Sequence, residues 1–577
     1  MTLSQALALV QRRIDAAQRR KIFLACGFQP LHLVTLIQGH FAERFPNQAA
    51  EIPTGTYGDI EGTLATASRC EAEAAAVVIE WSDLDPRLGL RSAGGWAISG
   101  QADILKTCHE RFARLLGGLR ALVTRMPVAL VPPTLPLQFL GHTASWQSSS
   151  NELELQNQLA RFLAEAALIT GVSVLRPSSL ARLSPEASRL DALMELRAGF
   201  PYTIAHASAV ASQVVKLLFP PTPMKGLITD LDETFWSGIV GEAGVRGVSW
   251  SLADHTQIHG LYQQMLGHLS EMGVLLAMAS KNEFAVVEQA LRRDDLLVPG
   301  KSFFPVIANW GPKSHSIAEI LRTWNIGAEC VVFVDDSAME IDEVRIAFPA
   351  MTCLQFSAKQ PAKTLELFEK MRDLFGKPAI HPEDALRQAS IRANAAVQPA
   401  AGNSLDGEFV RGLQGRLTFD CRKDPANKRL LELINKTNQF NLNGVRLSDG
   451  EWLKLLQDQN SLVAGVSYQD KFGPLGTIGV LAGRHVGGHF ELTSWVLSCR
   501  AFSRKIEHHM LDYLFNHLHV AAVRLAFRPT DRNQPLQQHL DSLGLDGDAN
   551  AEMLLGREQF QNHLEDLPHE VRLQTND

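Results

Sequence analysis

Two aspartates, Asp230 and Asp232, stand in the segment D-L-D-E-T, which directly follows the apolar run G-L-I-T. A carboxylate just past the carboxyl end of a central parallel strand projects into the crevice where α/β sheets bind ligands. From that position Asp230 can attack phosphorus and form an aspartyl-phosphate. Asp232 can protonate the leaving oxygen and later activate a water molecule. The spacing therefore predicts phosphoryl transfer through a covalent intermediate.

Three more polar residues follow in chain order, each at the end of an expected strand or the start of an expected helix. Ser280 follows the run V-L-L-A-M-A, Lys313 begins a helix, and Asp335 follows V-V-F-V. Ser280 can donate a hydrogen bond to a phosphoryl oxygen, and Lys313 can neutralise negative charge. Asp335, together with Asp230 and the carbonyl oxygen of Asp232, can hold Mg²⁺. Phosphoryl transfer mostly needs positioning and charge neutralisation, and this set supplies both.

The same residues have a less specific explanation. A D-x-D-x-T segment occurs by chance, and acidic residues that follow strands often cap helices. Four elements in one order, three of them at strand ends, favour phosphoryl transfer over that alternative.

The motif set resembles that of the haloacid-dehalogenase-like superfamily. The matching residues are Asp230, Asp232, Thr234, Ser280, Lys313, Asp335 and Asp336. The segments D-L-D-E-T-F-W-S-G-I-V-G-E-A-G, S-K-N and F-V-D-D-S are similar in particular to FkbH-like proteins of subfamily IIIC. The resemblance implies catalytic roles for Asp230, Asp232, Thr234, Ser280 and Lys313.

The resemblance also has implications for the metal and the substrate. The implied cofactor is Mg²⁺, and the implied metal ligands are Asp230, Asp232, Asp335 and Asp336. Trp236, in a flap over 235–250, would shield the site, and Trp236 and Asn282 would contact the substrate. No large cap insertion is visible, so an extended or protein-borne substrate can enter. Glu233 and Phe235 depart from the family's usual residues and can alter the flap.

Alternating apolar runs and amphipathic segments predict an α/β protein with three domains. The predicted divisions are an α/β domain over 1–220, a phosphatase or phosphotransferase domain over 221–375, a linker over 376–404 and an α+β domain over 405–577. The resemblance implies a flavodoxin- or SGNH-hydrolase-like first domain, a Rossmannoid haloacid-dehalogenase-like second domain and a GNAT-like acyltransferase-type third domain. Residues 1–20 are expected to form one amphipathic helix.

The third domain carries further polar candidates. Its segments N-K-T-N-Q-F-N-L and S-C-R look like FkbH-like signatures. Asn435 and Asn438 would contact a carrier or its acyl group, unless this run is only a solvated helix end. Cys499 precedes a helix and has basic neighbours, so its thiol can become a nucleophile; the alternative is a buried structural cysteine. Arg500 can meet a phosphopantetheine phosphate, although the glycines of the acetyltransferase R-x-x-G-x-G/A motif are absent.

The first domain resembles SGNH hydrolases more weakly. Cys26 stands where the nucleophilic serine of those enzymes is expected, after the first strand. No G-D-S segment is present, and His206 is the only candidate for the base. A lone histidine is more often structural, so this domain is interpreted as a binding or scaffold unit.

The composition limits the expected partners. The chain of 577 residues has a net charge of −7, which gives no support for a nucleic-acid or membrane-surface partner. No apolar run reaches the roughly 18 residues needed to cross a bilayer, and no signal peptide is expected. Seven cysteines without a C-x-x-C pair fit a reducing cytoplasm.

The resemblance implies a specific reaction. FkbH-like proteins take the glyceryl unit of 1,3-bisphosphoglycerate, remove phosphate and deliver a glyceryl thioester to an acyl carrier protein in polyketide-type biosynthesis. Cys499 would accept the acyl group, and the aspartate site would hydrolyse the remaining phosphate ester. Two alternatives stay open. One is a stand-alone phosphatase for a small sugar or acid, with accessory binding domains, and the other is a non-catalytic scaffold that recruits carrier proteins.

Overall fold

The computed structural model describes most of the chain. The described residues are 1–12, 18–92, 95–137, 142–377, 380, 391–392, 407–425, 427–471, 473–498, 501–502, 504–545, 553–564 and 567–574. They form two compact units, Met1–Pro221 with Leu447–Asp458 and Thr222–Arg446 with Gln459–Asp577. The predicted linker over 376–404 and its short helix lie almost entirely outside the described residues.

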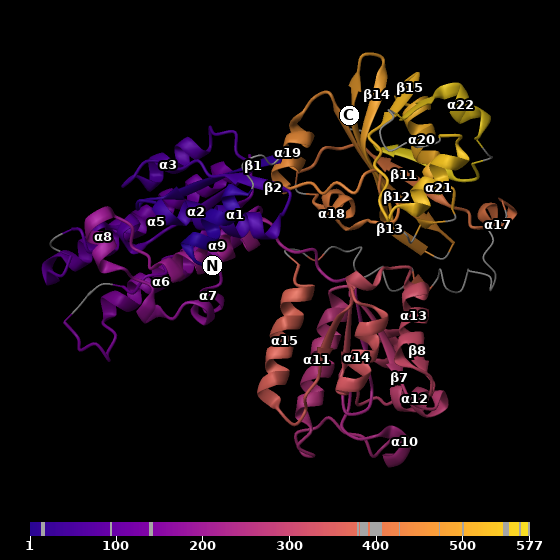
Figure 1. Cartoon of the computed structure of the whole chain (residues 1–577), viewed down its shortest axis with the longest axis horizontal. Coiled ribbons are helices and arrows are strands. Elements are labelled where there is room, and N and C mark those ends of the chain that lie inside the picture. The colour runs from indigo at the N-terminus through magenta and orange to yellow at the C-terminus, as the bar shows by residue number, and fades with distance from the viewer. Residues whose placement is uncertain are drawn as a thin grey trace. The chain divides into compact units, whose positions relative to one another are not determined.

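The first unit is built on a parallel sheet of five strands in the order β2-β1-β3-β4-β5. The strands are β1 (Gln18–Cys26), β2 (Gln48–Glu51), β3 (Ala74–Val78), β4 (Val128–Val131) and β5 (Val172–Val174). One face carries α1 (Leu3–Gln11), α2 (Leu31–Arg44) and α9 (Ile204–Leu218), and the other carries α3 (Ile60–Ala67), α5 (Gln101–Val123) and α6 (Ser150–Ala167). Figure 1 labels these helices. Shorter helices are α4 (Trp81–Leu84), α7 (Pro177–Leu183) and α8 (Ala192–Ala198). Strands β3 and β4 are buried throughout, as a parallel sheet covered on both faces requires.

The N-terminal segment differs from the prediction of one helix over 1–20. Helix α1 ends at Gln11, and β1 already begins at Gln18. Arg20, only 8% exposed, pairs with Glu73 at 2.8 Å and with Glu451 at 2.7 Å. These ion pairs and the pairing with β2 place Arg20 in the sheet, because tertiary partners outweigh the helical pattern of this short segment.

Helix α19 (Asp449–Gln457) brings a distant part of the chain into the first unit. Ser448 caps it by accepting a hydrogen bond from the Glu451 amide at 3.2 Å. Gly450 lies so close to Glu73 that a Cβ there would come within 2.2 Å of the Glu73 carbonyl oxygen. Glycine therefore permits a contact between helix and sheet that a larger residue would prevent.

The second unit contains a parallel sheet of five strands in the order β10-β9-β6-β7-β8. The strands are β6 (Gly226–Thr229), β7 (Leu275–Ser280), β8 (Phe303–Ala308), β9 (Val331–Asp335) and β10 (Thr352–Gln355). Helices α11 (Gln257–Glu271), α12 (Phe284–Leu291) and α15 (Pro361–Phe375) cover one face, and α13 (Lys313–Trp324) and α14 (Ala338–Ala347) cover the other. A short helix, α10 (Val240–Ala243), lies in the segment between β6 and α11. The doubly wound arrangement predicted for this region is confirmed.

The second unit also contains a mixed sheet of seven strands in the order β16-β15-β14-β13-β12-β11-β17. The strands are β11 (Arg416–Asp420), β12 (Ser461–Asp470), β13 (Gly473–Val486), β14 (His489–Leu497), β15 (Ala522–Leu525), β16 (Met553–Gly556) and β17 (Glu570–Gln574). The β14–β15 and β11–β17 pairs are parallel, and the other pairs are antiparallel. The accompanying helices are α17 (Gly407–Gly412), α18 (Arg429–Lys436), α20 (Ile506–Asn516), α21 (Gln534–Ser542) and α22 (Arg557–Asn562). The α+β architecture predicted for the C-terminal region is confirmed.

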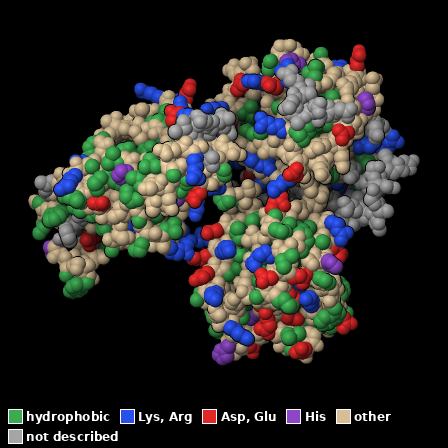
Figure 2. All heavy atoms as spheres, in the orientation of Figure 1, with side chains coloured by type: hydrophobic (Ala, Val, Ile, Leu, Met, Phe, Trp, Pro, Cys, Tyr) green, Lys and Arg blue, Asp and Glu red, His purple; other side chains and the backbone are tan. Residues whose placement is uncertain are grey.

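The surface shows no preference for one sign of charge on the face seen in Figure 2, where acidic and basic side chains are interspersed. This distribution agrees with the small net charge of −7. Among the described helices, none combines the length and the apolar character that crossing a membrane needs.

Candidate active site

The second unit's parallel sheet brings three chain segments to one edge. Strand β6 lies between β9 and β7, and backbone pairing keeps the three parallel strands in register up to Thr229. Asp230 directly follows β6, Ser280 ends β7, and Asp335 ends β9. Because the carboxyl ends of parallel strands meet at one edge, these three residues lie at the same crevice.

Lys313 forms the centre of the charge cluster at this edge. Its Nζ forms a direct ion pair with Asp230 Oδ1 and lies 3.0 Å from Asp335 Oδ2 and 3.1 Å from Glu340 Oε2. Lys313 is 2% exposed, Asp230 is 7% exposed and Asp335 is fully buried. Charges buried this deeply are maintained only when they are paired, and here each has an opposite charge in contact.

Burial and pairing set the protonation of these groups. Burial raises the pKa of Asp230 to about 7 and the pKa of Asp335 to about 6, while the Lys313 ammonium opposes both shifts. Burial alone lowers the pKa of Lys313, but attraction by the surrounding carboxylates is larger and raises its pKa above the ordinary value. Lys313 is therefore a permanent positive charge beside the oxygen that would attack phosphorus.

Asp232 is held in place by three donors. Its Oδ1 accepts from Trp236 Nε1 at 2.8 Å and from the Val240 amide at 3.0 Å, and its Oδ2 accepts from Asn282 Nδ2 at 2.8 Å. Asn282 Nδ2 also donates to Ser280 Oγ at 2.8 Å. Trp236 is fully buried and Asn282 is 3% exposed. Both side chains orient Asp232, and their predicted contact with substrate stays a prediction.

Thr234 connects the loop after β6 to the loop after β9. Its Oγ1 donates to Asp336 Oδ1 at 3.3 Å, and its carbonyl oxygen is hydrogen-bonded to His259 Nδ1 at 2.9 Å. Burial raises the pKa of Asp336 above its ordinary value. Glu233, one of the departures from the family pattern, adopts a φ of 55° and accepts a hydrogen bond from the Gly238 amide at 2.8 Å. The loop that follows Asp232 is thus fixed by its own side chains.

Two residues of the cluster, Glu340 and Lys281, were not predicted from the sequence. Glu340 contacts Lys313 and also pairs with Lys281 Nζ at 2.7 Å. It stands in the first turn of α14, three residues after the capping residue Ser337. An acidic residue there is commonly a helix cap, so only its place directly after β9 could have indicated a role at this edge.

The cluster has the donor set that suits a hard divalent cation. Single oxygens of Asp230, Asp335 and Glu340 lie within 4.8 Å of one another. Around this centre, the three carboxylates of Asp230, Asp335 and Glu340 face two ammonium groups, those of Lys281 and Lys313. Negative charge is in excess, and all the atoms that would coordinate a cation are carboxylate oxygens, which fits Mg²⁺.

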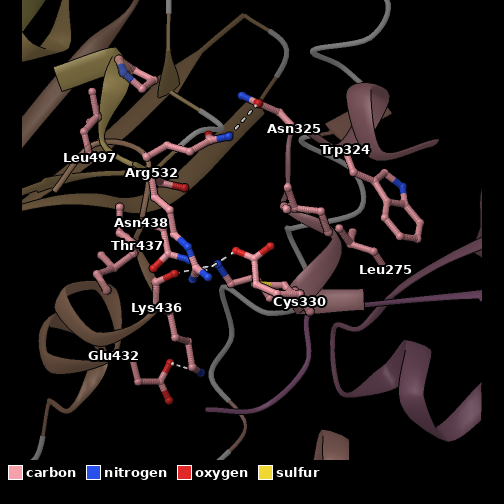
Figure 3. A pocket seen from close by; sticks show the side chains of 18 of the residues that line it. Leu275, Trp324, Asn325, Cys330, Glu432, Lys436, Thr437, Asn438, Leu497 and Arg532 are labelled. Atoms are coloured by element: carbon pink, nitrogen blue, oxygen red, sulfur yellow. Dashed lines mark hydrogen bonds and ion pairs between the residues drawn. The ribbon is translucent and has the colours of Figure 1, made fainter. Parts of the chain in front are cut away.

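Asn438 lies away from this edge. It lines a cavity of about 430 Å³ that also includes Lys225, Leu275 and Cys330, which stand at the amino ends of β6, β7 and β9 (Figure 3). The amino ends form the edge opposite Asp230. Asn438 Oδ1 accepts a hydrogen bond from Arg446, and Gln439 Nε2 donates to Asn325 Oδ1 at 3.3 Å. Asn435 lies near the end of α18, and Cys499 and Arg500 lie outside the described residues.

Cys26 and His206, the candidates in the first unit, are both buried and bonded to other groups. Cys26 Sγ donates to the Phe28 carbonyl oxygen at 3.4 Å, and burial raises the pKa of the thiol well above its ordinary value. His206 Nε2 and Nδ1 each lie 2.9 Å from a hydroxyl, that of Thr134 and that of Ser184. Burial lowers the pKa of His206 to about 3. Neither group is prepared to act as a nucleophile or base at neutral pH.

Glu80, after β3, completes this buried network. Its Oε1 accepts from the hydroxyls of Thr134 and Tyr202, each at 2.6 Å, and its Oε2 accepts from the amides of Thr134 and Leu135, each at 3.2 Å. Glu80 is 2% exposed, and burial raises its pKa to about 7. The cavity beside it has a volume of only about 30 Å³, which is room for about one water molecule. The arrangement fits the scaffold interpretation of the first unit.

Comparison with known proteins adds a shared fold. No protein-family model and no curated protein matches the chain. Among solved structures, the N-terminal part of the protein BF1531 from Bacteroides fragilis, which contains a phosphatase domain complexed with Mg, aligns with a TM-score of 0.50 at 18% identity. The alignment covers 66% of this chain and 100% of that one. At this identity the likeness establishes a common fold.

A second solved structure aligns much less well. It is a glucosamine N-acetyltransferase region of a fungal multi-domain GH3 beta-N-acetylglucosaminidase, with 10% identity and a TM-score of 0.18. That alignment covers 95% of this chain and 68% of the other. A TM-score this low does not indicate a common overall fold.

Proposed function

We propose that the second unit is a Mg²⁺-dependent phosphohydrolase or phosphotransferase that uses Asp230 as its nucleophile. The observation that carries the proposal is the Lys313 ammonium, buried between Asp230 and Asp335 at the carboxyl edge of the sheet. A fixed positive charge there stabilises the negative charge that a transferred phosphoryl group brings. The fold shared with a Mg-complexed phosphatase domain supports the choice of metal.

The residues divide the reaction into two balanced halves. Asp230 Oδ1 bonds to phosphorus while the bond to the leaving oxygen breaks, and Asp232 gives its proton to that oxygen. In the second half, Asp232 takes a proton from water, whose oxygen bonds to phosphorus as the Asp230–phosphorus bond breaks. Phosphate leaves, and both carboxyl groups return to their starting states. Bound Mg²⁺ supplies additional neutralisation of the phosphoryl oxygens.

We extend this proposal to glyceryl transfer, as the FkbH-like motifs suggest. The Cys499 thiolate would attack the acyl carbon of 1,3-bisphosphoglycerate and release phosphate, and the thiol of a carrier protein's phosphopantetheine arm would then displace Cys499. Asp230 would hydrolyse the remaining phosphate ester. The cysteines of the described residues are all free thiols, which supports a reducing, cytoplasmic setting for such a reaction.

A stand-alone phosphatase acting on a small sugar or acid is the second candidate. The observation that favours it is the place of Asn438, in a cavity at the amino edge of the sheet and not beside Asp230. In that case the C-terminal sheet is an accessory unit, and phosphate release needs no carrier protein.

Phosphate release from p-nitrophenyl phosphate and from acetyl phosphate tests the common part of both candidates. We expect activity that requires Mg²⁺ and is lost in Asp230→Asn but kept in Asp373→Asn, a control at an exposed aspartate of α15. Phosphate release retained in Asp230→Asn would contradict the proposal, and no phosphate release by the wild-type chain would favour a scaffold.

Intact-mass measurement of an acyl carrier protein separates the two candidates. After incubation with 1,3-bisphosphoglycerate, glyceryl transfer predicts a carrier heavier by one glyceryl group, and Cys499→Ala should abolish the gain. Phosphate release without any gain in carrier mass would favour the stand-alone phosphatase. Normal loading by Cys499→Ala would exclude the thiol relay.

A further inference from the structure

Three side chains of the types that bind metal ions, one carboxylate and two imidazoles, lie together at α20 and α21. Glu507 and His508 lie at the start of α20, and His539 lies in α21. Both helices are labelled in Figure 1. One carboxylate oxygen and one nitrogen from each imidazole lie within 4.8 Å of one another. The Glu507 Oε1 to His508 Nδ1 distance is 3.7 Å, and the two imidazole rings are 4.7 Å apart at an angle of 81°.

The two imidazoles each present a buried nitrogen without a hydrogen-bond partner in the described part of the chain. These atoms are His508 Nδ1 and His539 Nε2. His539 is 9% exposed, so water has little access to it. Buried polar atoms in proteins are nearly always hydrogen-bonded, and an unpaired one needs an explanation. Two such nitrogens in a cluster with one carboxylate indicate a missing common partner.

Packing alone does not account for His539. Its ring lies 5.9 Å from the ring of Phe440 and 5.6 Å from that of Trp495, so its surroundings are aromatic. An apolar side chain would fill this position without burying an unpaired nitrogen. An ion pair with Glu507 does not account for His539 either, because the histidine that lies 3.7 Å from the Glu507 carboxylate is His508.

The neighbouring His509 shows what a satisfied histidine looks like in the same helix. Its Nε2 is hydrogen-bonded to His569 Nδ1 at 3.0 Å. His509 therefore belongs to a separate pair, and the cluster contains Glu507, His508 and His539 alone among the described residues.

We propose that Glu507, His508 and His539 form a zinc-binding site in the C-terminal part of the second unit. Two imidazole nitrogens and one carboxylate oxygen are a typical zinc donor set, whereas Mg²⁺ and Ca²⁺ prefer oxygen alone. A tetrahedral zinc ion with bonds of about 2.1 Å needs donors about 3.4 Å apart. The 3.7 Å between Glu507 and His508 is close to that spacing, and the donor atom of His539 lies within 4.8 Å of both.

The three protein ligands leave a fourth position for water or for a substrate oxygen or sulfur. Side chains of Glu507 and His508 are 17% and 14% exposed, so a small ligand can reach the ion from solvent. This site is distinct from the cluster around Asp230, which has oxygen donors and a lysine at its centre. The chain would then hold two metals with different coordination preferences.

Zinc titration of the full chain, purified without a histidine tag and stripped with a chelator, tests the assignment. We expect one tightly bound zinc ion per chain. His508→Gln and His539→Gln should each weaken zinc binding at least about 100-fold. That loss is larger than the loss caused by removing a hydrogen-bond partner of a metal ligand. Two matched controls should keep wild-type binding: Asp230→Asn at the other cluster, and His485→Gln at an exposed histidine of the same sheet.

Zinc binding that survives in both histidine variants would overturn the assignment, since other groups would then hold the ion. Circular dichroism and a thermal melt establish whether each variant folds. If a variant does not fold, the Co²⁺-substituted wild-type chain decides the question. Tetrahedral Co²⁺ bands without a thiolate charge-transfer band are expected, and their absence would equally overturn the proposal.

Discussion

The carboxyl edges of the two parallel sheets balance their buried charges in different ways. At the second unit's edge, Asp230 and Asp335 face the Lys313 ammonium, and acidic groups outnumber cations. At the first unit's edge, the carboxylate of Glu80 is surrounded by hydroxyl and amide donors, which include Thr134 and Tyr202. The first arrangement leaves charge to bind a cation and an anionic substrate, whereas the second is satisfied internally.

The comparison shows that polar side chains at strand ends do not by themselves leave charge free to bind a ligand. Both sheets are parallel, and both place polar side chains at the edge where ligands bind in such folds. What distinguishes the Asp230 edge is a buried cation held among carboxylates. Charge that a polar cluster does not neutralise internally is therefore a better guide to function than the location of the cluster.

Removing the cation should have the largest effect. Lys313→Met leaves Asp230, Asp335 and Glu340 facing one another without their shared counter-charge. We expect phosphatase kcat to fall about 10²- to 10³-fold, as when a fixed donor to a developing anion is lost. Steady-state assays at saturating Mg²⁺ measure this. His206→Gln, in the hydroxyl-bonded network, should leave kcat unchanged, and an equal loss in both variants would break the contrast between the two edges.

In the first unit, ionisation of the buried Glu80 carboxyl group should instead change the free energy of unfolding. Because the folded-state pKa of Glu80 is raised to about 7, its contribution is complete below the unfolded pKa of 4.5 and is lost as pH rises through 7. The loss amounts to about 3 kcal/mol for a shift of this size. Hydrogen exchange of the β3 and β4 amides between pH 4.5 and 7.5 should show local stability falling with pH.

Glu80→Gln cannot ionise at this position, so it should make the pH dependence less steep, and the neighbouring Asp83, whose pKa burial also raises to about 7, should keep part of it. Only the slope is compared, so a constant cost of the substitution does not affect the test. A slope equal to that of the wild type would show that Glu80 does not titrate in this range.

Glu340 offers a test of the metal site with a smaller effect. Glu340→Gln keeps the size of the side chain but removes one of the three grouped carboxylates. We expect the Mg²⁺ concentration needed for half-maximal activity to rise about 10- to 100-fold. Asp342→Asn, on the same helix and exposed, is the matched control. An unchanged Mg²⁺ requirement would mean that Glu340 serves only to pair Lys281 and Lys313.

The smallest effect is expected from loosening Asp232. Trp236→Phe deletes the indole donor to Asp232 Oδ1 but keeps an aromatic ring in the buried position. One hydrogen bond to a charged group is worth about 1.5 kcal/mol, so kcat should fall about tenfold. Trp250→Phe is the control, because its indole donates to the Asp295 carbonyl oxygen and not to the site. Equal losses in the two variants would indicate a general packing effect.

The sequence predicted those parts of the fold and site that depend on local pattern. The apolar runs before Asp230, Ser280 and Asp335 are strands, as expected, because buried parallel strands read as continuous apolar segments. These three residues lie at one edge of the sheet because the strands that precede them are parallel. Glu340 and Lys281 were missed because their role depends on where α14 begins in space.

Features that depend on contacts between distant parts of the chain leave no signal in the local sequence pattern. The packing of α19 against the first unit depends on Gly450 lying beside Glu73, residues far apart in the chain. The start of β1 at Gln18 depends on the ion pairs of Arg20 with Glu73, which directly precedes β3, and with Glu451 in α19. The cluster of Glu507, His508 and His539 joins two helices whose relative positions no local periodicity encodes.

Direct detection of an aspartyl-phosphate tests the central claim. The Asp232→Asn chain, which can form the intermediate but lacks the group that activates water, is incubated with acetyl phosphate and Mg²⁺ and quenched in acid. Peptide mass spectrometry should then find one phosphoryl group on Asp230, absent from Asp230→Asn. Phosphate release by the wild-type chain with the phosphoryl group on another residue, or with none trapped, would contradict nucleophilic attack by Asp230.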